Sequence, residues 1–568
     1  MNSRRTHHSK NTSTDLSIDG LVHKQISQSF MGLSPISLAL AYGDWLSHLA
    51  ISPGKQAELA QLAISLQQKN LSPDNACTDS RFKSSSWQQW PFNIYKNNYQ
   101  ALESLWNAST QVNGTNKHHN DIVKFFTRQS LDAMSPSNWP WTNPDILNDW
   151  QQSNGQSLIK GMQHLLQDAQ HASSAANADL PELSHQVGKD VAITPGKVVY
   201  KNHLIELIQY EPTTAKVLRE PLLIVPSCIM KYYILDLSPK NSMVKYLVDQ
   251  GITVFMVSWR NPDSKDRDLG MDDYIQLGIL DPIQHIQQTT KTEHIHAMGY
   301  CLGGTFLSIA AAYLGRDQQV SPLKSVTLLA AQTDFSEPGE LGVFIDDDQL
   351  LTLQEEMAEK GYLSGRQMAS SFQFLNSRDL VWSRNTQRYW LGQDEIGNDM
   401  MSWNKDTTRL PARMHTEYLN SLFLNDAITE GHYRALGEVI SLRDIHAPLF
   451  VVGTTRDHIS PWKSVYKIHL TIDAPITFAL ASGGHNAGIV SEPGHPNRSY
   501  QLLLQEDQYA WIDQEEWQAK APVYQGSWWE AWSDWLGQHS SGQCRARAIT
   551  KPHLSDAPGH YVKVRYAD

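Results

Sequence analysis

A cysteine lies between two glycines in the Gly-x-Cys-x-Gly pattern from Gly299 to Gly303. The preceding residues, 294 to 298, are typical of a short buried strand, and the apolar spacing that follows predicts a helix ending at Gly315. The glycines permit a sharp turn and a close approach of strand and helix. Unpaired N–H groups at the start of that helix favour a thiolate and a developing oxyanion. Cys301 is therefore a candidate nucleophile, although cysteine is also a common buried apolar residue.

Two later loops carry residues that could complete a proton relay with this cysteine. The apolar run 449–452 leads to Asp457, and the run 477–480 leads to His485. The order nucleophile, acid, histidine is that of α/β hydrolases, in which the histidine takes the proton of the nucleophile and the acid orients the histidine. We expect Cys301, Asp457 and His485 to meet at one end of a sheet.

Each of these assignments has an alternative in the sequence. Asp334 follows the apolar run that ends at Ala331, and this loop is the other place from which such a fold supplies an acid. His458 is next to Asp457, but a sequence neighbour usually points elsewhere. His495 lies in a proline-containing loop and is expected at the surface. Asp457 and His485 remain the favoured pair because both loops are in the expected order.

An oxyanion hole requires two N–H groups directed at the carbonyl oxygen of the substrate. The first candidate is the N–H of Leu302, which follows the nucleophile. The second belongs to the loop after the apolar run 222–225, where Ile229 is the candidate.

The elements that must position these residues form a regular series. Residues 198–200 and 204–208 resemble a hairpin around Asn202 and His203. Helical stretches then alternate with apolar runs at 222–225, 253–258, 295–298, 326–330, 449–452 and 477–480. Such alternation predicts a parallel α/β sheet with crossover helices, and hence an α/β-hydrolase fold.

A long insertion separates the fourth of these runs from the fifth. We interpret residues 333–440 as a cap over the active edge of the sheet, because a normal crossover is much shorter. Its many aromatic residues could exclude water, and the glycines and acidic residues of 336–366 suggest a part that opens. The aromatic residues are Phe372, Phe374, Trp382, Tyr389, Trp390, Trp403 and Tyr418.

The remaining chain divides into three predicted regions. Residues 1–20 are polar and are predicted to be a disordered start. Residues 21–185 show helical periodicity and predict a mostly helical N-terminal domain, with a polar linker over 167–178. Residues 186–568 are then the catalytic domain.

Composition excludes several function classes. A net charge of −12 in 568 residues argues against nucleic-acid binding. Four separated cysteines, without a Cys-x-x-Cys pair, argue against a disulfide framework, and no His or Cys motif predicts a metal. There is no apolar run long enough for a membrane span and no signal-peptide core, so a cytoplasmic location is expected.

Several longer motifs are similar to those of class I polyhydroxyalkanoate synthases. They are PSCIMKYYILDL (226–237), LVDQGITVFMVSWRNPD (247–263), GYCLGG (299–304), DLVW (379–382), DHISPW (457–462) and GSWW (526–529), together with SPSNW (135–139) and TPGKVV (194–199). The resemblance spans most of the chain. One departure is Asn486, where the family commonly has isoleucine.

This resemblance implies an acyltransferase that polymerises (R)-3-hydroxyacyl-CoA, chiefly 3-hydroxybutyryl-CoA, into polyester with release of coenzyme A. It further implies a homodimer on cytoplasmic polyester granules, with no cofactor beyond the coenzyme A of substrate and product, and no metal. Cys301 would be the acylated nucleophile, Asp457 the acid and His485 the base. The alternative function is a hydrolase with the same fold and triad, acting as a polyester depolymerase or an acyl-CoA thioesterase.

Overall fold

The computed structural model describes residues 35–565, except 71–78, 175–182, 317–319, 366, 369–373, 376, 396, 506–510 and 550–552. The predicted disordered start (1–20), Cys77, Phe372 and most of the second half of the predicted linker lie outside the described residues.

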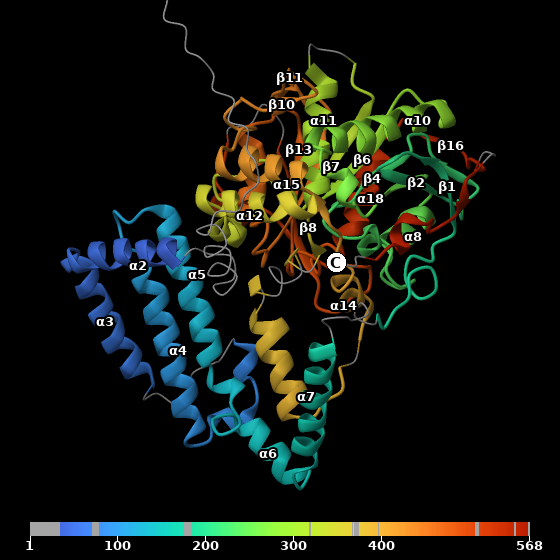
Figure 1. Cartoon of the computed structure of the whole chain (residues 1–568). Coiled ribbons are helices and arrows are strands. Elements are labelled where there is room, and N and C mark those ends of the chain that lie inside the picture. The colour runs from blue at the N-terminus through green and yellow to red at the C-terminus, as the bar shows by residue number, and fades with distance from the viewer. Residues whose placement is uncertain are drawn as a thin grey trace, which may run out of the picture.

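The core of the α/β unit is an eleven-stranded sheet with the order β15-β14-β13-β12-β7-β6-β4-β5-β2-β1-β17. In Figure 1 its labelled strands β13, β7, β6, β4, β2 and β1 follow one another from left to right. Six consecutive strands in this order are parallel: β13 (Ile476–Ala481), β12 (Leu449–Thr454), β7 (Leu323–Leu329), β6 (Ile295–Tyr300), β4 (Leu222–Val225) and β5 (Val254–Trp259). Nearly every residue in them is buried, which explains why they stand out in the sequence as continuous apolar runs. The predicted α/β-hydrolase sheet is confirmed.

Antiparallel strands extend the sheet at both edges. On one side, β2 (Ile205–Tyr210) and β1 (Gly196–Lys201) form the predicted hairpin, which β17 (Ser555–Asp556) extends. On the other side lie β14 (Ser499–Gln505) and β15 (Val523–Gln525). These two strands were not predicted, because their residues are only partly buried or exposed, and the leucines 502–504 of β14 form too short an apolar run to stand out. A separate pair joins β3 (Lys216–Leu218) to β16 (Gln543–Arg545).

Helices cover both faces of the sheet because alternate strand residues point in opposite directions. Leu223 and Phe255 face a core formed with α9 (Met271–Ile275), α10 (Asp281–Thr290) and α11 (Leu302–Gly315). Leu222 and Val254 face a second core with α8 (Met243–Asp249) and α18 (Trp528–His539). Two further helices, α16 (Trp462–Tyr466) and α17 (Gln514–Lys520), contribute to the first core.

The N-terminal part of the described chain is helical, as the sequence predicts. It contains α2 (Pro35–Ala50), α3 (Pro53–Asn70), α4 (Phe92–Ser109), α5 (Lys117–Met134), α6 (Pro144–Gln152) and α7 (Gln156–Ser174). These helices form a separate body beside the α/β unit (Figure 1). Its core around Trp45 and Phe125 also includes Val343 and Leu375, which lie between β7 and β12.

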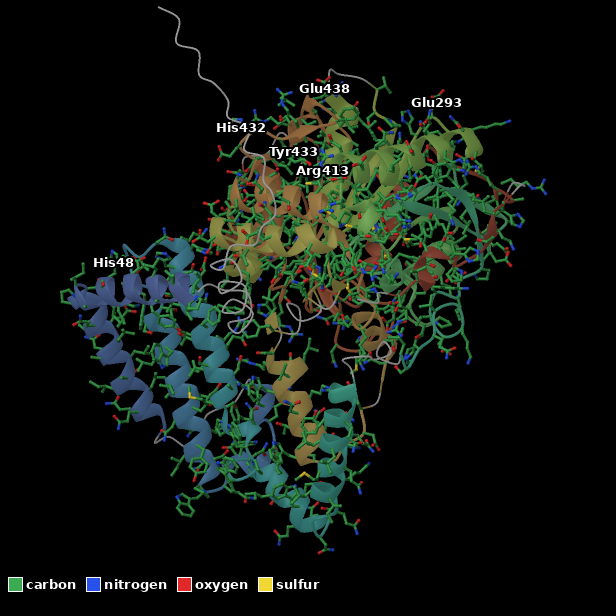
Figure 2. The ribbon with its side chains drawn as sticks, in the orientation of Figure 1. His48, Glu293, Arg413, His432, Tyr433 and Glu438 are labelled. Carbon is green, nitrogen blue, oxygen red and sulfur yellow. The ribbon has the colours of Figure 1, made fainter. Side chains whose placement is uncertain are left out.

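The chain between β7 and β12 forms a distinct layer of short elements. It contains the helices α12 (Asp347–Lys360), α14 (Asp399–Asn404) and α15 (Ala412–Tyr418). Between and around them lie the 3-10 turns η9 (Gly339–Phe344) and η13 (Leu442–Asp444) and the π-helical turns η10 (Arg378–Ser383), η11 (Thr386–Trp390) and η12 (Leu419–Leu424). Two short antiparallel pairs join β8 (Tyr362–Leu363) to β9 (Leu410–Pro411) and β10 (Arg434–Ala435) to β11 (Glu438–Val439). We refer to this insertion as the cap. Its last part, marked by His432, Tyr433 and Glu438, lies on the side of the molecule away from the helical domain (Figure 2).

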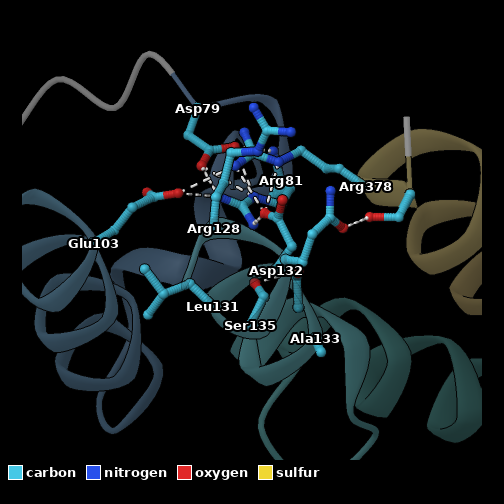
Figure 3. A network of polar contacts seen from close by, with 12 residues as sticks. Asp79, Arg81, Glu103, Arg128, Leu131, Asp132, Ala133, Ser135 and Arg378 are labelled. Carbon is cyan, nitrogen blue, oxygen red and sulfur yellow. Dashed lines mark hydrogen bonds and ion pairs between the residues drawn. The ribbon is translucent and has the colours of Figure 1, made fainter. Parts of the chain in front are cut away.

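Ion pairs connect the helical domain to the cap. Arg81 pairs with Asp79, Glu103 and Asp132, and Arg378 of the cap reaches the same Glu103 and Asp132 (Figure 3). A second contact lies on α7 and η11, where Arg388 donates two hydrogen bonds of 2.7 Å to Asp168. The helical domain therefore packs against the cap through defined charged pairs.

Candidate active site

Cys301 occupies the turn between β6 and α11 in a strained backbone conformation. Its φ is 53° and its ψ is −127°, a region that residues other than glycine rarely adopt. Its N–H donates to Leu329 O at 2.9 Å, and its carbonyl accepts from the N–H of Gly304 at 2.8 Å. These backbone bonds hold the thiol at the carboxyl end of the parallel strands and at the N-terminus of α11.

The positions on both sides of Cys301 require glycine, because other backbone segments approach them too closely for a Cβ atom. A Cβ on Gly303 would lie 2.3 Å from Val225 O, and one on Gly299 would lie 2.4 Å from the Cα of Gly304. None of these three glycines carries the positive φ of the turn, which falls on Cys301 itself. The glycines therefore let β6, α11 and the loop after β4 approach one another closely. The backbone strain of the turn lies on Cys301, the candidate nucleophile.

Asp457 and His485 meet at the same end of the sheet. His485 Nδ1 lies 2.7 Å from Asp457 Oδ2, and Asp457 Oδ1 accepts from the N–H groups of Ile459 (2.9 Å) and Ser460 (2.8 Å). Thr454 Oγ1 also donates to Oδ2 at 3.3 Å. The backbone of one short turn thus orients the carboxylate toward the imidazole.

The His485 side chain also lies beside the Cys301 side chain, close enough for the two to interact electrostatically. Burial opposes a charge on the imidazole, but the Asp457 carboxylate and the adjacent cysteine outweigh burial and raise the pKa of His485 well above its usual 6.5. The structure therefore brings Cys301, His485 and Asp457 into one continuous chain of contacts. An imidazole in this position can accept a proton from the thiol while the carboxylate stabilises the resulting charge.

The alternative residues lie outside this chain of contacts. Asp334 accepts from the N–H and hydroxyl of Ser336 and lies 3.7 Å from Lys467. His458 is about half exposed and lies beside Glu340, and His495 is partly exposed, with its Nδ1 2.9 Å from Pro496 O. The geometry thus favours Asp457 over Asp334 as the partner of His485.

The two predicted oxyanion donors have different surroundings. Leu302 is the first residue of α11, where an N–H has no acceptor within the helix. The N–H of Ile229 instead donates to Ser227 Oγ at 3.3 Å. Leu302 has the geometry of an available donor, whereas Ile229 would have to exchange its present acceptor for the substrate.

The loop that carries Ile229 is held by the cap and by the chain end. Thr408 Oγ1 donates to the carbonyls of Cys228 (2.7 Å) and Ile229 (2.6 Å). Lys231 Nζ donates to Val564 O at 2.6 Å, and burial lowers the pKa of this lysine to about 8. Two separate parts of the chain therefore hold this loop beside the site.

Cap residues also lie close to the thiol. Tyr418 of α15 packs edge-on against Phe335 and Phe423, and burial raises the pKa of its phenol well above 10, an effect to which the nearby Cys301 and Cys228 add. Other predicted cap aromatics face the helical domain: Phe374 packs on Phe125, and the Trp390 ring lies beside that of Trp150. The cap therefore has one aromatic face toward the sheet edge and another toward the helices.

Several supporting residues of the site were not predicted. The Tyr300 hydroxyl donates to Asn486 Oδ1 at 2.6 Å, which links the residue before the nucleophile to the residue after the histidine. The indoles of Trp528 and Trp529 donate to Gly488 O (3.0 Å) and Ile489 O (2.9 Å) in the same loop. The only sequence signals for these contacts were the departure at Asn486 and the GSWW motif.

Groups that would hold a metal are not found among the described residues, where no three His, Cys, Asp or Glu side chains cluster suitably. Cys228, Cys301 and Cys544 are free thiols. Of the helices in the described ranges, none is long and apolar enough to cross a membrane.

Comparison with known proteins agrees with this geometry. Residues 78–247 match the model of the poly-beta-hydroxybutyrate polymerase (PhaC) N-terminus, residues 13–55 match a poly-beta-hydroxybutyrate polymerase N-terminal model, and residues 221–492 match the alpha/beta hydrolase fold.

Relatives named poly(3-hydroxyalkanoate) polymerase align with most of the chain. The protein from Methylorubrum extorquens is 38% identical over 86% of this chain and 81% of its own. Those from Rhizobium meliloti and Cupriavidus necator, both described as polymerase subunit PhaC, are 35% and 34% identical, each over 86% of this chain and over 80% and 83% of their own. The chain belongs to the poly(3-hydroxyalkanoate) polymerase family and is an acyltransferase.

Proposed function

We propose that this polymerase transfers (R)-3-hydroxyacyl groups, chiefly 3-hydroxybutyryl, from coenzyme A to a growing polyester through a covalent acyl-Cys301 intermediate. The observation that carries this mechanism is the contact chain from the Cys301 thiol through His485 to Asp457. Family membership favours the polymerase over the hydrolase alternative.

The acylation step uses His485 as base and then as acid. Nδ1 of His485 faces Asp457, so Nε2 is the nitrogen available to accept the proton of Cys301. The thiolate attacks the thioester carbonyl, and the N–H of Leu302 stabilises the oxyanion. The bond from the carbonyl carbon to the sulfur of coenzyme A breaks, and the departing thiolate takes the proton from His485.

The elongation step repeats the proton transfers with a hydroxyl group. The hydroxyl of a second hydroxyacyl group gives its proton to His485 and attacks the acyl-Cys301 carbonyl. An ester bond forms, the bond to Cys301 breaks, and the cysteine recovers its proton from His485. A thioester suits this task because it keeps the acyl group reactive, whereas a serine ester would store less reactivity.

A thioester intermediate must also be protected from water. Tyr418 with Phe335 and Phe423 supplies an aromatic surface of the cap near Cys301. We propose that these rings exclude water while the acyl group waits for a hydroxyl.

The assembly and location follow from the same family resemblance. We propose a homodimer that acts in the cytoplasm at the surface of polyester granules, with coenzyme A entering only as part of the substrate and leaving as product, and with no metal. Exposed indoles on the helical domain, including Trp90 and Trp141, are compatible with contact to an apolar polymer.

Incubation of the purified protein with (R)-3-hydroxybutyryl-CoA tests the reaction. We expect insoluble polyester together with free coenzyme A, measured by gas chromatography of the methanolysed polymer and by thiol titration. Release of free 3-hydroxybutyrate and coenzyme A without polymer would support the hydrolase alternative.

A further inference from the structure

The direction of the Asp457 carboxylate depends on the turn formed by residues 457–460. Oδ1 is occupied by the N–H groups of Ile459 and Ser460, so that Oδ2 alone faces His485. Any shift of this turn would rotate the carboxylate and change the contact to the imidazole. Residues that support the outer side of this turn should therefore affect catalysis.

The cap segment at Gly339 and Glu340 packs on the outer side of this turn. The N–H of Glu340 donates to His458 O at 3.0 Å. Gly339 has a φ of +74°, and a Cβ there would lie 2.8 Å from His458 O and 3.0 Å from Ile459 O. Only glycine permits this approach, which places Glu340 against the turn.

The Glu340 side chain is in turn held by the helical domain. Arg128 of α5 binds both carboxylate oxygens, with Nη2 2.8 Å from Oε2, and His458 Nδ1 lies 3.4 Å from Oε1. Burial disfavours the charged carboxylate, but hydrogen bonds from Arg128 and His458 outweigh burial and lower the pKa of Glu340 to about 2. The carboxylate is therefore ionised and bonded on both sides.

We propose that Glu340, fixed by Arg128, is a positioning residue for Asp457, so that the helical domain sets the geometry of the acid in the active site. Through backbone and side chain together, Glu340 joins α5 to the turn whose N–H groups hold Asp457. This inference rests on the proposed role of Asp457 as the catalytic acid.

The competing explanation is that Arg128 and Glu340 only attach the helical domain to the cap. The Arg388 and Asp168 pair provides a matched control, because it also joins the two regions through a bidentate ion pair. The hydrogen bonds between Arg388 and Asp168 join η11 to α7 and do not involve the 457–460 turn. A purely structural role predicts equal effects of breaking either pair.

The experiment compares Glu340→Gln, Arg128→Met, Arg128→Lys and Arg388→Met with the unaltered chain. For each we would measure kcat and KM with (R)-3-hydroxybutyryl-CoA, and the pH dependence of Cys301 alkylation by iodoacetamide. Alkylation reports the thiolate and does not require polymerisation. Thermal unfolding of each variant measures the structural contribution separately.

We expect Glu340→Gln and Arg128→Met to lower kcat about 10-fold with little change in KM. The reason is that a misplaced Asp457 carboxylate stabilises the positive charge on His485 less well. The alkylation midpoint should move to higher pH, in the same direction as in Asp457→Asn but by less. Arg128→Lys should recover part of the activity, and Arg388→Met should change neither kcat nor the midpoint. If Glu340→Gln does not fold, the two Arg128 variants carry the comparison.

Equal kcat and midpoint shifts in Arg128→Met and Arg388→Met would overturn the inference. Wild-type turnover in Asp457→Asn would instead overturn the proposed acid on which it rests. The two failures are therefore distinguishable.

Discussion

The sheet edge and the cap are held in place by different kinds of contact. At the sheet edge, Cys301 and Asp457 are fixed by backbone N–H groups a few residues away, such as those of Gly304 and Ile459. The cap depends on side chains far away in sequence, as in the pairs of Arg378 with Asp132 and of Arg388 with Asp168. Single side-chain substitutions should therefore leave most of these backbone contacts in place, whereas the cap, and through Glu340 the turn that holds Asp457, should respond to changes in the helical domain.

The strongest test of the sheet edge is removal of the nucleophile. We expect Cys301→Ala to abolish polymer formation and to change the unfolding free energy by no more than about 1 kcal/mol. Cys301→Ser should be nearly as inactive, because a hydroxyl is a poorer nucleophile at neutral pH. Assays of coenzyme A release and denaturant unfolding measure both effects.

Glycine in place of Cys301 separates the backbone strain at this position from the loss of the nucleophile. Cys301→Gly should be equally inactive yet roughly 1 to 2 kcal/mol more stable than Cys301→Ala, because glycine relieves the positive φ. Equal stability of the two variants would show that the elbow is not strained.

The acid provides the second test. We expect Asp457→Asn to lower kcat on the order of 10³-fold, and Asp334→Asn to have little effect, because of these two carboxylates it is Asp457 that hydrogen-bonds to His485. The reverse result would identify Asp334 as the acid.

The same acid should also make stability depend on pH. The folded-state pKa of His485 lies above its usual 6.5, so the pair contributes its stability fully below about pH 6.5 and loses it as the pH rises through the raised pKa. The stability difference between the unaltered chain and Asp457→Asn should therefore shrink as pH rises, as urea unfolding at several pH values would show.

A substitution at Asn486 tests a smaller effect, which is the support of the loop that carries His485. Asn486→Ile should lower the free energy of unfolding by about 1 to 3 kcal/mol, because it leaves the buried Tyr300 hydroxyl without its acceptor. Adding Tyr300→Phe should recover much of that loss. Additive effects in the double variant would show that the two side chains do not interact.

Hydrogen exchange tests the cap with the smallest perturbation. We expect amides near Glu340 to exchange slowly because they bond to the acid turn, whereas α12 exchanges faster and slows when a non-hydrolysable acyl-CoA analogue binds. The sequence predicts that residues 336–366 open, and the structure divides this segment into a slowly exchanging part near Glu340 and a faster part in α12. Uniform exchange across 336–365, with and without the analogue, would show that the cap opens as one piece or not at all.

The features predicted from sequence are those that depend on local pattern. The buried parallel strands and the Gly-x-Cys-x-Gly turn follow from apolar runs and from glycine sterics, and Asp457 and His485 follow from their order along the chain. The contacts of Glu340 with Arg128, or of Tyr300 with Asn486, have no such pattern, because each joins residues from different elements. Strands β14 and β15 escaped prediction for a related reason, since β15 is an exposed edge strand and β14, next to it, is only partly buried and has an apolar run limited to residues 502–504.

The indole contacts of Trp528 and Trp529 imply an order of assembly during synthesis. Both residues lie after His485 in the chain, and both bond to carbonyls of the loop that follows it. On the ribosome, the elbow and the acid turn emerge before α18, so the nascent chain holds its nucleophile before the histidine loop has its support. The histidine loop can therefore take up its bonds to both indoles only after α18 has been synthesised.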